Sequence, residues 1–465
     1  MSHLSRLTPP PNTQRQKQTV LGRHFCLGLC LAATLFWQLP ARAEADLIAG
    51  PMVGHTDSHS SRIWLQTDEA GKVQIEYWER GSAEKKRSAE ISTSDKSWFT
   101  ALLHLPDLKP DQTYQYRVYL DGQEIKTPKV QHFKTPAFWQ KGQAAPDFQI
   151  VMGSCYYIND DWMKLLGIEY GGPLQIFQVL EQEKADFMLW LGDNVYMSPL
   201  DVSNPWRMNS RYRMQRSQPI IQPLLAKMPQ YAIWDDHDFG PNNSTSGFPL
   251  KKASLDLFKA YWANPRYGLA TEPGNWSRLS WNDVDIFLTD GRYYRDAYDL
   301  PEEKRKLLGE SQLAWLKQEL KASQAPFKVV VMGSPIFNPV YSESFSQYPS
   351  EYNDFFEFIQ SEKIEGIVFV SGDRHHSDLY KEPVKNGYPF YNFTSSPLTS
   401  LPTQIMSAAE QNLPKRVPGT LVQQHNYGML KFEGPPGKRV LIMETRDAKG
   451  KLLWEYRIQE QELRF

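Results

Sequence analysis

The sequence has little cysteine and no excess of charge of either sign. Only 3 of its 465 residues are cysteine, and 52 basic residues face 53 acidic ones, for a formal net charge of -1. Such a balanced chain has no overall field that would recruit nucleic acid or an acidic membrane, so neither is expected as its main partner. Hydrophobic residues make up 41% and charged residues 23% of the chain. Those fractions predict a globular protein with a full core.

An apolar run near the N-terminus, from Phe25 to Leu39, predicts a targeting segment. Basic residues precede it: Arg6, Arg15, Lys17 and Arg23. The run is shorter than the about 20 residues of a membrane span, and the small-x-small motif Ala41-Arg42-Ala43 follows it. We therefore predict a cleaved signal peptide over residues 1–43, export to the periplasm or the extracellular space, and no stable membrane anchor after cleavage. An uncleaved anchor is the alternative.

Signal cleavage would leave Cys155 as the remaining cysteine, because Cys26 and Cys30 lie within residues 1–43. A lone thiol is unusual in an oxidising compartment, where free thiols are readily modified. Either Cys155 is a small buried core residue, or another group occupies its sulfur.

Residues 44–136 are predicted to form an all-β domain. Short runs such as 73–78 and 113–119 have the partial alternation of strands, and Asp121-Gly122 is a turn signal. The stretch 108–116 resembles the end of a fibronectin type III-like or immunoglobulin-like β-sandwich. Such a domain either binds a carbohydrate or protein partner or packs against the rest of the chain. Residues 137–146, rich in glycine, proline and polar residues, are predicted to be a linker.

From residue 147 to 465 short apolar runs alternate with helix-like segments, which is typical of a layered α/β domain with buried strands. The runs lie at 148–152, 187–191, 231–234, 286–289, 328–332 and 366–370. One predicted helix covers residues 310–321.

Polar residues follow four of these runs, in positions where α/β folds bind ligands beyond the carboxyl ends of their strands. The motifs are Gly153-Ser154-Cys155, Gly192-Asp193-Asn194-Val195-Tyr196, Asp235-Asp236-His237-Asp238 and Gly372-Asp373-Arg374-His375-His376. Each residue alone has an ordinary structural explanation. Together, so many buried carboxylates would repel each other at high cost unless metal ions neutralised them.

Taken in order, these motifs resemble those of the alkaline phosphatase D (PhoD-like) family of calcineurin-like metallophosphoesterases. The resemblance extends to Asp290–Arg295, Gly309–Leu316 and Thr394–Ser396, and it covers most of residues 145–400. It implies a layered αββα metallophosphoesterase domain preceded by a β-sandwich.

The resemblance also implies two adjacent metal sites. Cys155, Asp193, Tyr196 and His375 would form the first site, which in such proteins holds iron. Asp193, Asp236 and Asp373 would form the second, which holds calcium, with Asp193 as the bridge. The residue types agree: a thiolate, a carboxylate and a phenolate suit ferric iron, because ionising a phenol at neutral pH needs a strong Lewis acid. Oxygen ligands alone suit calcium, magnesium or manganese.

The expected chemistry is hydrolysis of a phosphoester by a water that the metals acidify. Arg374 and Arg292 are candidates for binding the phosphate, and for each the alternative is a salt bridge to nearby carboxylates. His237 resembles the histidine that protonates the leaving oxygen, and Asp238 or Asp235 would orient it; a supporting role behind the metal ligands is its alternative. His376 either lines the pocket or replaces His375 as a ligand.

Two departures from the wider superfamily point to a harder second metal. Met332-Gly333-Ser334-Pro335 offers no imidazole where many members have a metal-binding histidine, and Gly372-Asp373 stands where Gly-His is common.

We therefore expect an exported metal-dependent phosphomonoesterase, phosphodiesterase or both, acting on a small phosphoester. The alternatives are a phospholipase-type phosphodiesterase of the same family and a non-catalytic binding protein with a decayed enzyme domain. Metals with a purely structural role are a further alternative, disfavoured because ligand sets of this kind leave open positions. The sequence leaves the oligomeric state and the natural substrate open.

Overall fold

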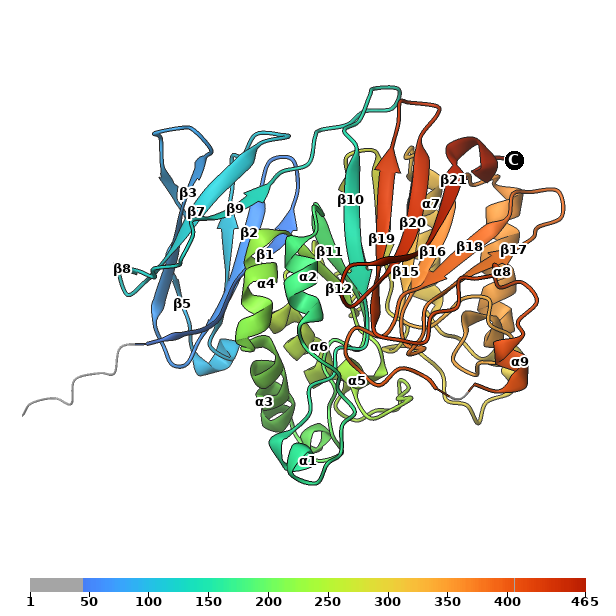
Figure 1. Cartoon of the computed structure of the whole chain (residues 1–465), viewed down its shortest axis with the longest axis horizontal. Helices are drawn as coiled ribbons and strands as arrows, with labels where there is room; N and C mark the ends of the chain where they lie inside the picture. Colours follow the sequence, from blue (N-terminus) through green and yellow to red (C-terminus); the bar gives the residue numbers. More distant parts are fainter. Residues whose placement is uncertain (1–44, 405) are drawn as a thin grey trace, which may run out of the picture. The chain divides into compact units, whose positions relative to one another are not determined.

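A computed structural model describes residues 45–404 and 406–465 (Figure 1). The predicted signal peptide, residues 1–43, lies outside the described residues. Within the described part, no helix has the length and apolar character needed to cross a membrane.

Two small sheets form the N-terminal β-region, residues 47–134. The first has the order β1-β2-β6 and the second β4-β3-β7-β8, with β5 beside β3 and β9 beside β7. In β7 the burial alternates residue by residue, as expected for a strand with one face on a core. Ile63, Val73 and Tyr116 from both sheets share one hydrophobic core, so the sheets face each other. The fibronectin type III-like assignment stays a prediction. The strands are β1 (Leu47–Thr56), β2 (Ser61–Thr67), β3 (Lys72–Glu79), β4 (Lys86–Arg87), β5 (Ile91–Ser92), β6 (Thr100–Leu105), β7 (Thr113–Leu120), β8 (Gln123–Glu124) and β9 (Gln131–Lys134).

The rest of the chain is built on two six-stranded sheets. One has the order β12-β11-β10-β19-β20-β21 and the other β13-β14-β15-β16-β18-β17. Strands β10, β11 and β12 run parallel, as do β14, β15, β16 and β18. The bounds are β10 (Phe148–Gly153), β11 (Phe187–Leu191), β12 (Gln230–Ile233), β13 (Ser277–Trp281), β14 (Val284–Leu288), β15 (Phe327–Met332), β16 (Ile367–Ser371), β17 (Asp378–Glu382), β18 (Phe390–Thr394), β19 (Asn426–Glu433), β20 (Val440–Asp447) and β21 (Leu452–Gln459).

Helices cover the outer faces of the two sheets (Figure 1). Residues of α2, α3, α4 and α6 share a core with Met188 and Trp190 of the first sheet. Residues of α7 and α8 share a second core with both sheets, which therefore pack against each other. The helices are α1 (Asp161–Leu165), α2 (Ile176–Gln182), α3 (Pro205–Arg216), α4 (Gln222–Lys227), α5 (Asp236–Phe239), α6 (Lys251–Tyr261), α7 (Glu310–Ala322), α8 (Pro349–Ser361) and α9 (Ala408–Gln411). The predicted mixed α/β fold behind an N-terminal β-sheet region is confirmed.

The N-terminal β-region is bonded directly to the first of these sheets and its helices. The His55 N–H donates to the Ala263 carbonyl at 2.7 Å, and the Trp64 indole donates to the Ala260 carbonyl at 2.7 Å. Tyr116 donates to the carbonyl of Ala226 at 2.9 Å. Residues 137–146 run as irregular backbone between the two parts. The domain limits inferred from the sequence stay a prediction, since all described residues belong to one compact unit.

His55, at this contact, gives the fold a pH dependence that can be measured. Burial lowers its pKa to about 4, helped by the nearby Arg62 charge. Because the folded state resists protonation that the unfolded state accepts below about pH 6.5, stability is lost as the pH falls from 6.5 to 4. Between pH 7 and pH 4.5 this one group accounts for about 2–3 kcal/mol. On acidification from pH 7 to pH 4.5, the unfolding free energy of wild type should therefore fall by about 2–3 kcal/mol more than that of His55→Gln, as measured by urea denaturation. The exposed His104→Gln control should follow wild type, and equal losses in all three proteins would contradict the assignment.

Candidate metal centre

The four polar motifs meet at the carboxyl ends of the parallel strands. Cys155 follows β10, Asp193 follows β11, Asp236 begins α5 just after β12, and Asp373 follows β16. Four of the six predicted ligands have left-handed backbones, with φ of 61° at Cys155, 51° at Asp193, 70° at Asp373 and 52° at His375. Such conformations cost about 1–3 kcal/mol each and persist where the surrounding structure imposes them, often at functional sites.

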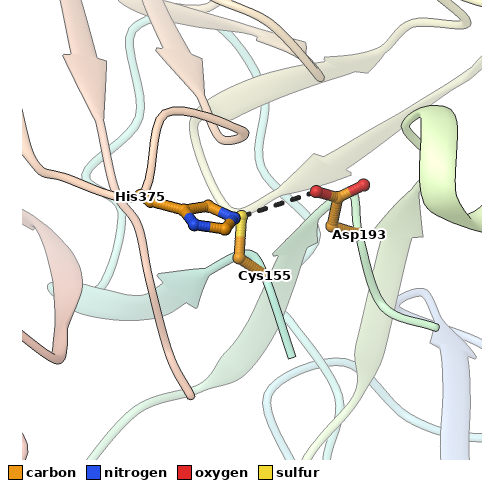
Figure 2. A group of neighbouring side chains, drawn as sticks. All are labelled: Cys155, Asp193 and His375. Atoms are coloured by element: carbon orange, nitrogen blue, oxygen red, sulfur yellow. Dashed lines mark hydrogen bonds between the residues drawn. The ribbon is translucent and has the colours of Figure 1, made fainter. Parts of the chain in front are cut away.

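The donor atoms predicted for the first site lie together. The Cys155 Sγ is 3.6 Å from Asp193 Oδ2, and the Tyr196 hydroxyl donates to the same oxygen at 3.0 Å. The Tyr196 hydroxyl is also 3.1 Å from His375 Nε2. Figure 2 shows Cys155, Asp193 and His375 converging, and one ligand atom from each lies within 4.8 Å of the others. This group could hold a metal ion.

The orientation of His375 suits a ligand. Its Nδ1 is 2.8 Å from the carbonyl of Leu401, an acceptor, so this nitrogen carries the proton. Nε2 is then left with its lone pair toward Asp193 and Tyr196. Burial lowers the pKa of the imidazole, which keeps it neutral as a ligand must be. His376 points elsewhere, with Nδ1 3.0 Å from the Arg374 carbonyl and Nε2 3.6 Å from Asp378, so His375 is the histidine of the group.

The electrostatics of the first site favour a bound cation. Burial raises the pKa of the Cys155 thiol, although the Ser396 hydroxyl donates to its sulfur at 3.1 Å. The Ser154 hydroxyl lies 3.4 Å from the same sulfur and donates to the Ser395 carbonyl at 3.0 Å. Burial, then the Asp236 charge, raises the pKa of Asp193, and burial with the Asp193 charge raises that of Tyr196. No two of these groups ionise easily together without a positive charge between them. A cation there would reverse all three shifts.

The carboxylates predicted for the second site fall into two overlapping groups that share Asp236 and also include His237 and Asp235. Asp193 and Asp236 group with His237, and Asp236 and Asp373 group with Asp235, each set within 4.8 Å. In the described part of the chain, the buried Asp373 Oδ2 has no hydrogen-bond partner. Burial, followed by the charge of Asp235, raises the pKa of Asp373 well above its usual value. A buried carboxylate oxygen without a donor is an open position for a hard cation.

The carboxylates of Asp235 and Asp238 form hydrogen bonds that fix the loops of the site, and these bonds do not involve the His237 ring. Asp235 precedes α5 and accepts from Arg292 Nε at 2.5 Å. Asp238 accepts the N–H groups of Asn194 at 3.0 Å, Val195 at 3.1 Å and Asp235 at 3.0 Å, which joins the loop after β11 to the loop after β12. The sequence predicts that Asp238 or Asp235 orients His237. Its ring instead stacks on Tyr196, with ring centres 4.3 Å apart.

The two predicted phosphate-binding arginines differ sharply in setting. Arg292 is fully buried, and its guanidinium contacts Asp235 and Glu343 at 2.5 Å each. Although burial opposes it, those carboxylates raise the pKa of Arg292, which is therefore charged. This arrangement is the salt bridge given above as the alternative for Arg292, while its substrate role stays a prediction.

Arg374, between Asp373 and His375, lies nearer the surface with a side-chain exposure of 16%. Its guanidinium pairs with Glu410 and lies 3.7 Å from the centre of the Tyr341 ring. Reasoning from the sequence did not find Tyr341, Glu343 or Glu410. They belong to no motif and reach the site only through the tertiary fold.

The chain is similar in sequence and in fold to known phosphatases. A family model described as PhoD-like phosphatase matches residues 160–435, and one described as a domain of unknown function matches residues 44–138. Alkaline phosphatase D of Bacillus subtilis (strain 168) is 22% identical over 322 residues, 58% of this chain and 52% of that protein. The chain thus aligns with about half the length of this relative.

Two solved structures share the fold across most of the chain. A structure of PhoD superimposes with a TM-score of 0.71 at 17% identity, covering 89% of this chain and 91% of the other. A purple acid phosphatase from yellow lupin (Lupinus luteus) seeds superimposes with a TM-score of 0.64 at 12% identity, covering 88% of this chain and 74% of the other.

The buried ion pairs of Arg292 predict a large stability effect. Arg292→Met would leave Asp235 and Glu343 buried without their cation, so we expect a loss of about 3–5 kcal/mol of unfolding free energy. Arg207→Met, at an exposed position of α3, serves as the control and should stay within about 0.5 kcal/mol of wild type. Urea denaturation measures both. Wild-type stability in Arg292→Met, together with weakened phosphate binding, would instead support the substrate role.

Proposed function

Because the chain belongs to the PhoD-like phosphatase family, we propose that it is a metal-dependent hydrolase of phosphoric esters. The observation that carries the proposal is the gathering of a thiol, a phenol, an imidazole and several carboxylates at the ends of four strands. Such a donor set is costly to bury without metal and is suited to phosphoester chemistry with it.

We assign the ligands as the sequence predicted them. Cys155, Asp193, Tyr196 and His375 would hold ferric iron at the first site. Asp193, Asp236 and Asp373 would hold calcium, or else manganese or magnesium, at the second, so Asp193 would serve both sites. Bound there, the metals would supply Lewis acidity and a water acidified toward neutral pH.

The chain's own residues bind the ester and move the proton. Arg374 is charged, near the surface and next to two proposed ligands, so it binds the phosphate oxygens. His237 donates a proton to the leaving oxygen, and stacking on Tyr196 fixes the plane of its ring. Asp238 keeps the loops that carry Asp193 and His237 together through its backbone hydrogen bonds.

The substrate is a small phosphoester, a monoester, a diester or both, met outside the cytoplasm. Export is compatible with a free thiol at Cys155, because a thiol that is buried and bound to a metal would be shielded from oxidation. The N-terminal β-region is a fibronectin type III-like sandwich that packs against the catalytic domain rather than binding a separate partner. A phospholipase-type diesterase is the second candidate. The exposed apolar side chains of Trp162, Leu165 and Leu166, in the segment after the Cys155 loop, are the feature that would suit an apolar partner such as a lipid chain.

The first test is metal content with activity. Purified chain without residues 1–43 should carry about one iron and hydrolyse a chromogenic phosphomonoester or phosphodiester, because the ligand set is complete. Elemental analysis and initial rates on both esters measure this, and the ratio of the two rates separates the reaction classes. Chelation should abolish turnover and metal addition should restore it. A well-folded, metal-free protein that hydrolyses neither ester would refute the proposal.

Cys155→Ser tests the first site directly. Serine has nearly the same shape, but its hydroxyl is a much poorer ligand for ferric iron, so iron content and turnover should both fall by more than about tenfold. Iron is measured by elemental analysis and by the visible absorption of the coloured ferric centre. Ser361→Ala, at an exposed position at the end of α8, is the control and should keep its iron. Wild-type iron and turnover in Cys155→Ser would show that the thiolate is not a ligand.

A further inference from the structure

The end of helix α3 joins the two loops that carry Cys155 and Asp193. Gln215 is buried, and its Nε2 donates to the carbonyl of Tyr156 and, at 2.7 Å, to the carbonyl of Asn194. Tyr156 directly follows Cys155, and Asn194 directly follows Asp193. One side chain therefore holds the backbone next to two of the proposed ligands.

The chemistry of this link is specific to an amide. The single NH₂ group of glutamine carries two N–H donors, and both are used here on separate carbonyls. The same loops are also joined through their backbones, since Tyr156 N–H donates to the Asp193 carbonyl at 2.9 Å and Cys155 N–H to the Gly192 carbonyl at 3.3 Å. Removing the amide would leave two buried carbonyls without this donor, and methionine or glutamate offers no replacement.

The next residue, Arg216, is the last residue of α3, and its side chain contacts the N-terminal β-region. Its NH1 is 2.7 Å from the sulfur of Met52 on β1. Its guanidinium lies 5.2 Å from the Trp64 ring of β2 and 4.1 Å from the Trp262 ring that follows α6. Burial lowers its pKa only to about 10, so it is charged at neutral pH and held by cation–π contacts.

A second link runs through Gln222 at the start of α4. The N–H of Gly50 on β1 donates to Gln222 Oε1 at 2.7 Å, and Gln222 Nε2 donates to the Arg216 carbonyl at 2.7 Å. The two regions also share a hydrophobic core, since Met52 and Trp64 pack in one cluster with Tyr156, Trp190 and Val195. The strands and loops that carry Cys155 and Asp193 therefore share one hydrophobic core with strands β1 and β2.

We propose that Gln215 is a positioning residue of the metal centre and that the N-terminal β-region, through Arg216 and Gln222, holds Gln215 in place. The region that matches a domain of unknown function thereby acquires a role: it fixes the spacing of the Cys155 and Asp193 loops. Metal binding by those loops rests on the function proposed above, but their positioning does not. A separate partner-binding module would leave the loops unchanged when its contacts are altered.

The experiment compares Gln215→Met with Gln218→Met in the chain without residues 1–43. Gln218 lies just after the same helix, and its side chain bonds back to Met214, to the carbonyl at 2.9 Å and to the sulfur. Its carbonyl, which accepts from Gln222 Nε2, is kept in the substitution. In the metal-free proteins, amide hydrogen exchange of peptides covering residues 153–157 and 192–197 should be at least about tenfold faster in Gln215→Met. After iron loading, Gln215→Met should release iron to a chelator about 10–100-fold faster, and Gln218→Met should match wild type. Unchanged loop exchange and iron release in Gln215→Met would overturn the proposal, even if its Tm fell.

Arg216→Met tests the connection to the N-terminal β-region, with Arg213→Met of the same helix as its control. We expect faster exchange in the same two peptides, and a combined Gln215→Met and Arg216→Met effect smaller than the product of the single effects, because both act through one link. Effects that multiply independently, or loops that stay unchanged in Arg216→Met, would refute the role of the N-terminal region. If wild type binds no iron, the exchange data still decide this inference while the proposed ferric site alone fails.

Discussion

The mutual repulsion of buried carboxylates is the constraint on which the rest of the structure depends. Asp193, Asp235, Asp236 and Asp238 are all buried within two adjacent loops, and Asp373 approaches them from the other sheet. The chain compensates part of this charge itself, through Arg292 and through the N–H groups that bind Asp238. The charge that remains uncompensated is gathered where the two proposed metal sites lie, so the repulsion that destabilises the fold also attracts cations.

Much of this could be predicted from the sequence, because it rests on local patterns. Buried parallel strands read as continuous apolar runs, and the carboxyl ends of parallel strands lie at one edge of their sheet, so the polar motifs after them were expected to converge. That the motifs come from two sheets was not evident from these patterns. The structure confirms that layout and brings Cys155, Asp193, Tyr196 and His375 together. That they bind metal stays a prediction. The left-handed backbones at Cys155, Asp193, Asp373 and His375 gave no sequence signal, since residues other than glycine seldom adopt this conformation and no local pattern marks where they do.

The partners of charged side chains could not be predicted, because they come from distant segments. Arg292 pairs with Asp235, 57 positions earlier, and Arg374 pairs with Glu410, 36 positions later. Both arginines sit in recognisable motifs, yet the sequence could not tell which one is closed off by salt bridges and which stays near the surface. Gln215 is the extreme case. An isolated glutamine in a polar helix has no pattern of its own, and its side chain bonds to two loops that lie 59 and 21 positions earlier in the chain.

The left-handed ligand positions have a consequence for the order of events as the protein matures. A flexible unfolded chain does not hold Cys155, Asp193, Asp373 and His375 in these conformations, so the complete ligand set exists only once both sheets and their loops have closed. Metal capture by the proposed centre would then be the last step of assembly rather than a nucleus for it. If the chain crosses a membrane before folding, as the predicted signal peptide implies, the ions that fill the centre would be chosen by the supply in the compartment where folding finishes, not by the one where synthesis began.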